Sequence, residues 1–199
     1  PEEVNCHDFL DDALGRAVPY GVYDVLVNRG FVRLGLSANT PAFAVAAVRA
    51  WWALLGCKRY AASARLLILA DAGGSNGCRP RLWKAGLQRE VADRYGLEVT
   101  VCHYPTRASK WNPVEQRLFG PISTNWAGEP LRTVERLLAF VRGTATRTGL
   151  TVTAAVDEAV YRKGVRVGDA EMTGLKVRRH DTCPQWNYTF SPRFDPAWN

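Results

Sequence analysis

The sequence lacks several features that would identify common classes of protein. No apolar run approaches the about 20 residues of a membrane span, and no signal peptide is visible. The five cysteines form no CxxC pair, so neither a zinc ribbon nor a disulfide framework is indicated, and a cytoplasmic location is expected. The glycine-rich phosphate-binding motifs GxxxxGK[ST] and GxGxxG are absent, as is any internal repeat.

The composition fits one medium-sized domain, or a domain with a small appendage, that binds a negatively charged partner. The chain has 199 residues, with 26 Lys and Arg against 19 Asp and Glu, which gives a net charge of +7. Nucleic acid is the commonest partner of such a basic protein, and a basic surface that binds nothing is the alternative. The sequence begins at Pro1, and Met172 is its only methionine, so we expect it to be a piece of a longer protein.

The spacing of apolar residues and of Gly, Pro and Asn predicts strands and helices in alternation. Asn28-Arg29-Gly30 joins two β-rich runs into a hairpin, and the helix after it is expected to end at Gly56. A break or kink is expected at Pro121. In chain order, the predicted elements are a hairpin (18–37), a helix (39–56), a strand (64–72), a helix (79–96), a strand (97–104) and two helices (112–126 and 129–149).

The character of the sequence changes near residue 149, and we expect the remainder to form a small α+β appendage. Its predicted elements are a strand (150–161), a short helix (168–175) and a final strand (186–193). The predicted organisation is therefore a core of residues 1–148 and an appendage of residues 149–199. The fold class is α/β, with helices on both faces of a mixed sheet in which the apolar strand 64–72 is central and buried on both faces.

Asp71 stands at the end of this apolar strand, in the sequence ADAGGSNG. Ligands of open α/β sheets bind beyond the carboxyl ends of the strands, so Asp71 is a candidate ligand of Mg²⁺ or Mn²⁺. Two other interpretations stay open: the glycine amides could cradle a phosphate, or Asp71 could only cap the turn that follows. A carboxylate leading the loop would repel a phosphate unless a cation lay between them, which disfavours the cradle.

Glu115, in the sequence SKWNPVEQRLF, is the second candidate carboxylate. Asn112 is a natural helix N-cap and Pro113 suits the first turn, so Glu115 could simply complete a capping box. However, one helix separates the two strands that precede it, and a right-handed crossover would place these strands side by side. The next helix would then project Glu115 toward Asp71, and a cation would relieve the repulsion between the two carboxylates.

Basic residues surround these carboxylates in the sequence. They form a candidate contact surface for phosphodiester backbones, although any one of them could simply be solvated. Trp111 could stack on a base, with packing in the core as the alternative. The candidate DNA-binding residues are Arg79, Arg81, Lys84, Arg107, Lys110, Trp111 and Arg117.

The order of elements together with these motifs resembles the RNase H-like catalytic core of DDE/D transposases. NPVE resembles the Asn-Pro-x-Glu motif of the Tc/mariner-like superfamily. Longer pieces, such as LLILADAGGSNGCRPRLWK, SKWNPVEQRLF and WNYTFSPR, resemble the Rhodopirellula-type DDE transposases, a bacterial insertion-sequence family. The resemblance covers nearly the whole chain. It implies a phosphoryl-transfer enzyme of the bacterial cytoplasm and nucleoid that acts on the DNA ends of its own transposon.

By this resemblance, Asp71 matches the second catalytic Asp of the family and Glu115 its third acidic residue, and both would bind a pair of Mg²⁺ or Mn²⁺ ions. The family's first Asp lies on a strand that would precede Pro1, so this chain alone is expected to be inactive. Asp8 and Asp24 are early acidic residues, but they match a loop motif and the first hairpin strand.

The resemblance also implies double-stranded DNA as the partner, both at the transposon ends and at the target, and a homodimer in the synaptic complex. A sequence-reading helix-turn-helix module would precede the core. Two alternatives stay open: a metal-dependent nuclease of the same RNase H-like fold, and an inactive DNA-binding remnant of a transposase.

Overall fold

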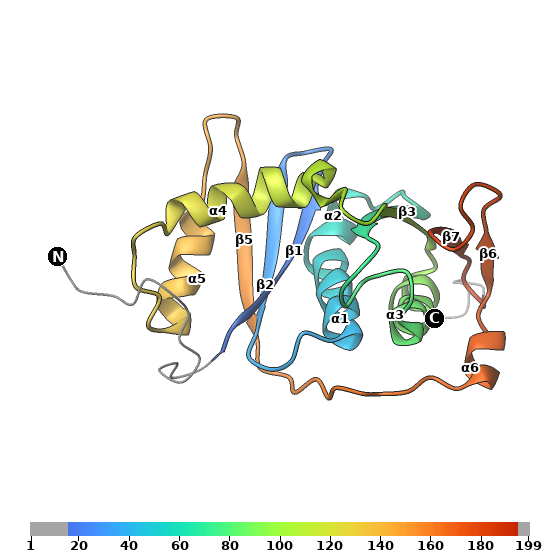
Figure 1. The fold of residues 1–199 in the computed structure, drawn as a ribbon. Coiled ribbons are helices and arrows are strands. Elements are labelled where there is room, and N and C mark those ends of the chain that lie inside the picture. The colour runs from blue at the N-terminus through green and yellow to red at the C-terminus, as the bar shows by residue number, and fades with distance from the viewer. Residues whose placement is uncertain (1–15, 195–199) are drawn as a thin grey trace.

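Two β-sheets form the framework of the protein, and helices pack against them (Figure 1). The structure is a computed structural model that describes residues 16–194. The strand order is β1-β2-β5 in the first sheet and β3-β4-β7-β6 in the second. The protein is therefore a mixed α/β fold, as predicted, but its described strands form two sheets in place of one.

The first sheet is built on the predicted hairpin. β1 (Val18–Asp24) and β2 (Arg29–Gly35) are antiparallel, and β5 (Thr151–Asp157) pairs with β2 in parallel. The strand that joins the hairpin thus comes from more than 100 residues further along the chain.

The hairpin turn lies slightly earlier than its sequence predicts. It occupies residues 25–28 and ends at Asn28, which has a positive φ of 53°. Asn tolerates this left-handed conformation better than most residues. Arg29 and Gly30, expected in the turn, already pair within β2. Gly30 is needed there for packing, because a Cβ would collide with the Leu118 side chain.

The second sheet contains the two predicted parallel strands. β3 (Arg65–Asp71) and β4 (Glu98–Tyr104) are hydrogen-bonded along their full length, so their carboxyl ends reach the same edge, as the crossover predicted. β7 (Asn187–Phe190) pairs antiparallel with β4, and β6 (Val177–Arg179) with β7. The short strand β6 has no counterpart in the predicted elements.

β3 is not the fully buried central strand that its apolar sequence predicted. Within residues 16–194 it pairs only with β4, so its other edge is open. Leu67 and Leu69 are 60% and 41% exposed, whereas Leu66 and Ile68 pack against the core. The outer edge of β1 is likewise open among the described strands. Each sheet therefore has one unpaired edge beside the site described below.

The first long helix extends beyond its predicted end. α1 (Pro41–Trp51) continues through a π-helical turn, η2 (Trp52–Gly56), into α2 (Cys57–Arg59). Gly56, the expected terminator, keeps a helical φ of −62°. A Cβ at Gly56 would lie 2.7 Å from Trp52 Cε3, so this glycine serves close packing and does not end the helix.

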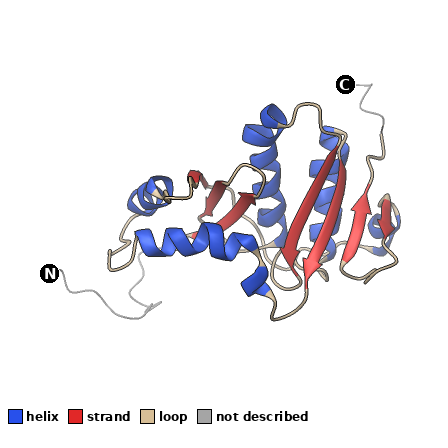
Figure 2. Ribbon diagram, turned by 90° about the horizontal axis from the view of Figure 1, so that it is seen from above, coloured by secondary structure: helices blue, strands red, loops and turns tan. Residues whose placement is uncertain are grey.

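The second long helix ends where the sequence predicts. α3 (Arg81–Leu87) continues as a π-helical segment, η3 (Gln88–Asp93), and the chain turns at Gly96 with a φ of +63°. α1 and α3 pack together beside the second sheet (Figure 2). Trp51 and Trp52 are buried in the hydrophobic core on this side.

The segment after β4 runs over the first sheet. A 3₁₀ turn, η4 (Ser109–Trp111), precedes the π-helical turn η5 (Glu115–Phe119) and α4 (Gly120–Asn125). The chain stays helical through Pro121, which lies in the first turn of α4, because the π-helical pattern of the preceding turn accommodates the missing N–H. The widened η5 turn comes directly before it.

α4 and α5 (Val134–Gly143) cover the first sheet and close a second hydrophobic core. Residues from the strands and from both helices form it. Its most buried members are Val32, Leu34, Leu118, Ile122, Val141 and Leu150. None of the helices within residues 16–194 has the length and apolarity needed to cross a membrane.

The region after residue 149 contributes to both sheets. β5 completes the first sheet, and β7 lies beside β4 in the second. Between them, residues 158–168 run along the lower edge of the body to α6 (Asp169–Thr173), as Figure 1 shows. These strands, expected in an appendage, are thus built into the two sheets.

Candidate active site

A cavity of about 440 Å³ lies at the carboxyl end of β3. Its walls come from four parts of the chain: the open edge of β1, Asn39 before α1, the loop that follows β3, and the segment between residues 105 and 119. Both candidate carboxylates, Asp71 and Glu115, line this cavity. They meet there because the parallel strands β3 and β4 end at the same edge, and each is followed directly by one wall of the cavity.

Asp71 is held by two hydrogen bonds from different elements. Its Oδ1 accepts a hydrogen bond from Asn112 Nδ2 at 3.1 Å, and its backbone oxygen lies 2.9 Å from His103 Nδ1. The turn after β3 is closed by backbone groups, with Cys78 N donating to the oxygen of Ala72 at 3.1 Å. The Asp71 carboxylate therefore does not cap this turn, and it faces the cavity.

Asn112 joins the helix that carries Glu115 to the end of β3. Its Oδ1 accepts a hydrogen bond from Val114 N at 3.3 Å, and its backbone oxygen accepts one from Glu115 N at 3.1 Å. Asn112 is thus the predicted N-cap, and its amide also reaches Asp71. Among the hydrogen bonds of the described residues, none joins Glu115 to the Asn112 N–H. The capping box is therefore not formed, which leaves the Glu115 carboxylate free to serve the cavity.

Glycines in the hairpin fix the position of the helix with Glu115. A Cβ at Gly21 would lie 2.8 Å from two carbons of the Phe119 ring and 3.0 Å from Leu118 Cδ2. η5 can press this closely on β1 only because position 21 has no side chain. The same contact fixes the position of η5, which begins with Glu115.

The environment of Glu115 opposes its ionisation. Partial burial of the carboxyl raises its pKa above the ordinary value of 4.5, and the negative charge of Asp71 raises it further. Two carboxylates that share one cavity gain from a cation between them, because it offsets both the burial and the repulsion. The pair therefore has the electrostatic character of a cation-binding site.

His103 holds the backbone of Asp71 through a hydrogen bond. Since the Asp71 backbone oxygen can only accept, Nδ1 of His103 donates, and Nε2 accepts from Tyr188 Oη at 2.9 Å. His103 is buried, and this burial lowers its pKa, which keeps the ring neutral. Tyr188 belongs to β7. This strand, near the C-terminal end of the described chain, therefore helps to position Asp71 through His103.

Only one of the predicted DNA-binding cations, Arg107, lines the cavity. Trp111, four residues after Arg107 in the sequence, is 70% exposed. The Nζ atom of Lys110 lies 5.2 Å from the centroid of the Trp111 ring. The alternative that Trp111 packs in the core is therefore wrong. Arg79 and Arg117 are exposed and form no ion pair with a described residue.

The two remaining cations have partners elsewhere. Arg81 pairs with Asp169 at 2.6 Å and donates to the backbone oxygen of Val167 at 3.2 Å. Lys84 Nζ lies 5.4 Å above the ring of Tyr188, and its partial burial lowers its pKa. Neither lines the cavity with Asp71, although the sequence places both within 13 positions of it.

Sequence reasoning missed the parts that four residues play in the site. Tyr20 and Gly21 form the wall on β1, and nothing in the local sequence of the hairpin indicates it. The support from His103 was also missed, since a single His in an apolar strand has no recognisable pattern. The second role of Asn112 could have been suspected, because it belongs to the same NPVE motif as Glu115.

The donor set suits a hard divalent cation in part. Mg²⁺ is commonly held by one or two carboxylates, with water and substrate phosphate as the other ligands. Asp71 and Glu115 meet that minimum. The part of the chain that the structure describes contains no group of three or more His, Cys, Asp and Glu that could hold a metal ion. Asp24 does not supply a third ligand, because it is buried against Arg59 and Tyr60, and Asp8 lies outside the described residues.

Comparison with family models assigns the chain to the class of transposase DDE domains. It belongs to the Rhodopirellula transposase DDE domain family, whose model matches residues 1–192. Neither the curated proteins nor the solved structures contain a match to the chain. The resemblance carried by ADAGGSNG and NPVE is therefore confirmed at the level of the family.

Proposed function

We propose that the chain is the catalytic part of a transposase that cleaves phosphodiester bonds at transposon DNA ends and transfers the cut strands to target DNA. Asp71 and Glu115 are its catalytic carboxylates. The observation that carries the proposal is their meeting in one cavity, where burial and mutual repulsion raise the pKa of Glu115.

Asp71 and Glu115, together with a further carboxylate, would hold a pair of Mg²⁺ or Mn²⁺ ions. Bound there, such ions would supply activation of the attacking oxygen and stabilisation of the leaving oxygen of a phosphodiester. Asn112 orients Asp71 through its amide, and His103 fixes the backbone of the same residue. Side chains held in this way lose little freedom when a ligand binds, which favours both affinity and geometry.

The third carboxylate would come from a strand between the two sheets. The open edges of β1 and β3 flank the cavity, and both have unpaired backbone groups among the described residues. A strand that paired with both edges would join the two sheets into one RNase H-like sheet and would bring its own side chains to Asp71. We infer that the first Asp of the family lies on this strand.

Double-stranded DNA is the proposed substrate, and its phosphates would contact Arg107 in the cavity wall. Exposed Lys110, Arg117 and Arg79 extend positive charge around it, and Trp111 is free to stack on an unpaired base. Such contacts position a phosphodiester more than they select a sequence. We further propose that two copies act together at paired transposon ends, at the nucleoid of a bacterial cell.

The test is cleavage of a donor plasmid that carries the element's ends, by the complete transposase that contains these residues, in the presence of Mg²⁺. Asp71→Asn and Glu115→Gln are each expected to lower the cleavage rate by about a hundredfold or more. Asp181→Asn is the matched control, because it removes one exposed carboxylate that lies outside the cavity.

Each result selects one interpretation. Unchanged cleavage in Asp71→Asn contradicts the assignment of the site. Equal cutting of duplexes without the element's ends identifies a metal-dependent nuclease. Binding of DNA without cleavage, under every divalent ion tried, identifies an inactive remnant.

A further inference from the structure

A second cavity, about 470 Å³ in volume, lies next to the first and differs from it in charge. No acidic residue lines it, whereas four cations do: Arg81, Arg162, Lys163 and Arg166. We call this cavity the basic groove. Asn39 lines both cavities, so the basic groove and the candidate active site are neighbours with Asn39 between them.

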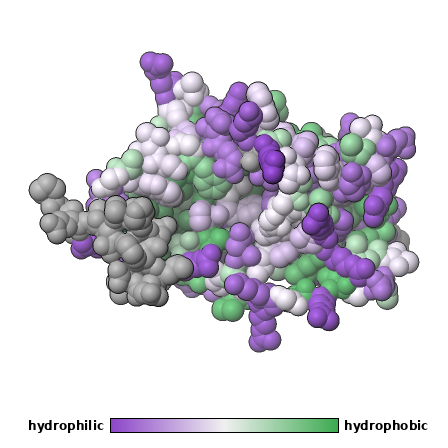
Figure 3. Space-filling view, in the orientation of Figure 1, coloured by the Kyte–Doolittle hydropathy of each residue, from purple (hydrophilic) through white to green (hydrophobic). Residues whose placement is uncertain are grey.

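The outer wall of the basic groove is a segment of residues 158–168, which we call the strap. It connects β5 to α6 along the lower edge of the molecule in Figure 1, and hydrophilic side chains project from this edge in Figure 3. Arg162, Lys163 and Arg166 are exposed on it. None of the three forms an ion pair or hydrogen bond with another of the described residues. Their charge is therefore available to a ligand.

The strap is anchored at both ends. At its start, Tyr161 N donates to Ser37 Oγ at 3.1 Å, and Tyr161 Oη donates to Asp157 Oδ2 at 2.9 Å. At its end, Val167 is buried and its backbone oxygen accepts from Arg81 at 3.2 Å. Between these anchors the chain turns at Gly164, whose φ of +71° favours glycine. The three free cations thus stand on a short arch with fixed ends.

The inner wall adds a weaker positive field. The groove reaches Thr40 and Pro41, the N-cap and first residue of α1, and the first turn of this helix contains no acidic residue. The N-terminal end of a helix carries a partial positive charge. The cations of the strap and the end of α1 therefore face the same space from opposite sides.

We propose that the basic groove binds the sugar-phosphate backbone of duplex DNA, on the stretch that continues past the bond held between Asp71 and Glu115. This proposal rests on the proposed function for its choice of polyanion. A duplex with one phosphodiester at the first cavity has further phosphates at regular spacing along its backbone, and the basic groove is the neighbouring surface, beyond Asn39. The strap contacts phosphates only, so it increases affinity for any sequence equally.

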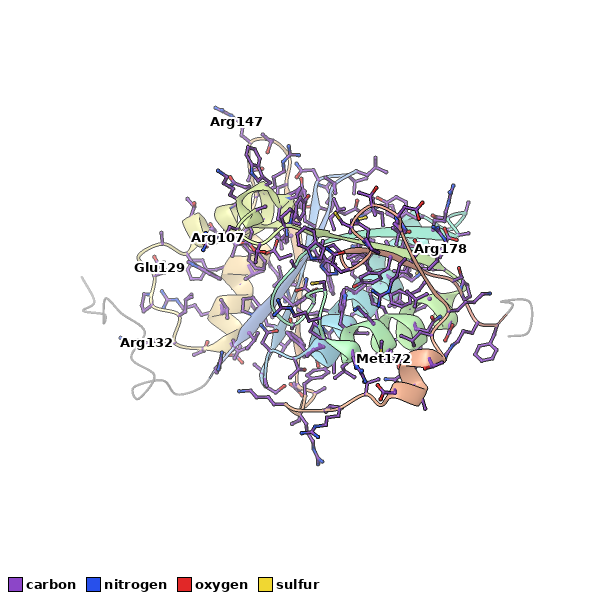
Figure 4. The ribbon with its side chains drawn as sticks, turned by 45° about the vertical axis from the view of Figure 1, so that its right-hand side comes forward. Arg107, Glu129, Arg132, Arg147, Met172 and Arg178 are labelled. Atoms are coloured by element: carbon purple, nitrogen blue, oxygen red, sulfur yellow. The ribbon has the colours of Figure 1, made fainter. Side chains whose placement is uncertain are left out.

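The experiment measures binding of a fluorescently labelled duplex of arbitrary sequence by anisotropy, in EDTA and over a series of salt concentrations. The strap variant is Arg162→Ala/Lys163→Ala/Arg166→Ala. The control variant, Lys58→Ala/Arg147→Ala/Arg178→Ala, removes the same charge from exposed positions outside both cavities; Arg147 and Arg178 lie far from each other in Figure 4. Circular dichroism verifies that both variants are folded.

We expect the strap variant to bind at least about tenfold more weakly than the control variant near 0.1 M salt, and its salt slope to fall by about 2 to 3. Equal loss in the two variants would mean that only net charge matters and would overturn the proposal. So would unchanged binding by the strap variant. If the unsubstituted protein itself fails to bind the duplex, the proposed function fails first; Asp71→Asn, by contrast, should retain the strap-dependent affinity.

Discussion

The side-chain amide of Asn112 donates a hydrogen bond to Oδ1 of Asp71 across 3.1 Å, and this bond ties the helix that carries Glu115 to the end of β3. The same Asn112 caps that helix through its Oδ1 atom. One residue therefore sets both the start of the helix and the orientation of the carboxylate opposite it. The two roles can be separated by substitution.

Asn112→Ser keeps a capping oxygen but removes the donor to Asp71. We expect its free energy of unfolding to fall by about 1 to 2 kcal/mol, because a hydrogen bond to a carboxylate is lost.

Asn112→Asp also keeps a capping oxygen but adds a third negative charge beside Asp71 and Glu115. Without divalent ions it should unfold at a lower temperature than the Ser variant, and Mg²⁺ should restore it more than it stabilises the unsubstituted protein. Thermal unfolding with and without Mg²⁺ measures both effects, and an identical Mg²⁺ response in all three proteins would contradict the metal site.

The raised pKa of Glu115 has two causes that can be measured separately. Burial is the larger cause and the charge of Asp71 the smaller. Asp71→Asn should therefore lower the pKa of Glu115 without bringing it to the ordinary 4.5, whereas Mg²⁺ should lower it in the unsubstituted protein. Titration of the Glu115 carboxyl carbon by NMR gives these values directly. If neither Asp71→Asn nor Mg²⁺ changes the pKa of Glu115, the two carboxylates do not share a site.

The sign of the linkage follows from the same shift. A carboxyl with a raised pKa binds its proton more tightly in the folded chain than in the unfolded one. Its ionisation therefore reduces stability as the pH rises from 4.5 through the folded pKa. Glu115→Gln should remove this decline, and the comparison of urea unfolding curves over this pH range checks it.

Much of the fold follows from local sequence, because turns and periodicity are local properties. The hairpin, the parallel pair β3 and β4, and the end near Gly96 of the helical segment that begins with α3 agree with their predictions. β3 does not, since a continuous run of Leu and Ile indicates burial but cannot indicate what covers the strand. The prediction that the helix ends at Gly56 was wrong for a related reason. Gly56 is small because the Trp52 ring packs against it, and the sequence alone does not distinguish such a packing glycine from one that ends a helix.

The motif residues of the candidate site could be predicted from the sequence, but the residues that hold them in place could not. Asp71 and Glu115 follow from their places after strands, and the crossover rule brings them together. The contacts from His103 and from β1 depend on pairing between distant segments, which a single sequence does not specify. Arg81 and Lys84 show the opposite error, since nearness in sequence to Asp71 does not put them in its cavity.

Protonation of His103 should destabilise the protein at mildly acidic pH. Burial lowers the pKa of this ring, so the unfolded chain binds the proton first as the pH falls below its ordinary pKa of 6.5. The free energy of unfolding should therefore decrease in that range, and His103→Gln should abolish the decrease. This slope is opposite in sign to that of Glu115, so urea unfolding is best compared in a Glu115→Gln background. If the free energy of unfolding still depends on pH in this range in the His103→Gln/Glu115→Gln variant, another group causes that dependence.

Tyr188→Phe tests the other end of the same chain of hydrogen bonds. It removes the donor to His103 Nε2, for which we expect a loss of about 1 kcal/mol of stability. In the complete transposase it should also lower the rate of Mg²⁺-dependent cleavage, because Asp71 is held less firmly. A loss of stability without any change in rate would limit His103 and Tyr188 to a structural role.

The open edge of β3 makes neighbouring positions respond differently to the same substitution. Leu67 is exposed, so Leu67→Thr should change the free energy of unfolding of the 199-residue chain by no more than about 0.5 kcal/mol. Ile68 packs against the core, so Ile68→Thr should cost about 2 kcal/mol or more. Denaturant unfolding of the two variants, with the unsubstituted chain as reference, gives both numbers. If Leu67→Thr cost as much as Ile68→Thr, Leu67 would be covered in solution and the two sheets would not be separate. In the complete transposase, a strand that fills the space between β1 and β3 should raise the cost of Leu67→Thr while leaving that of Ile68→Thr unchanged.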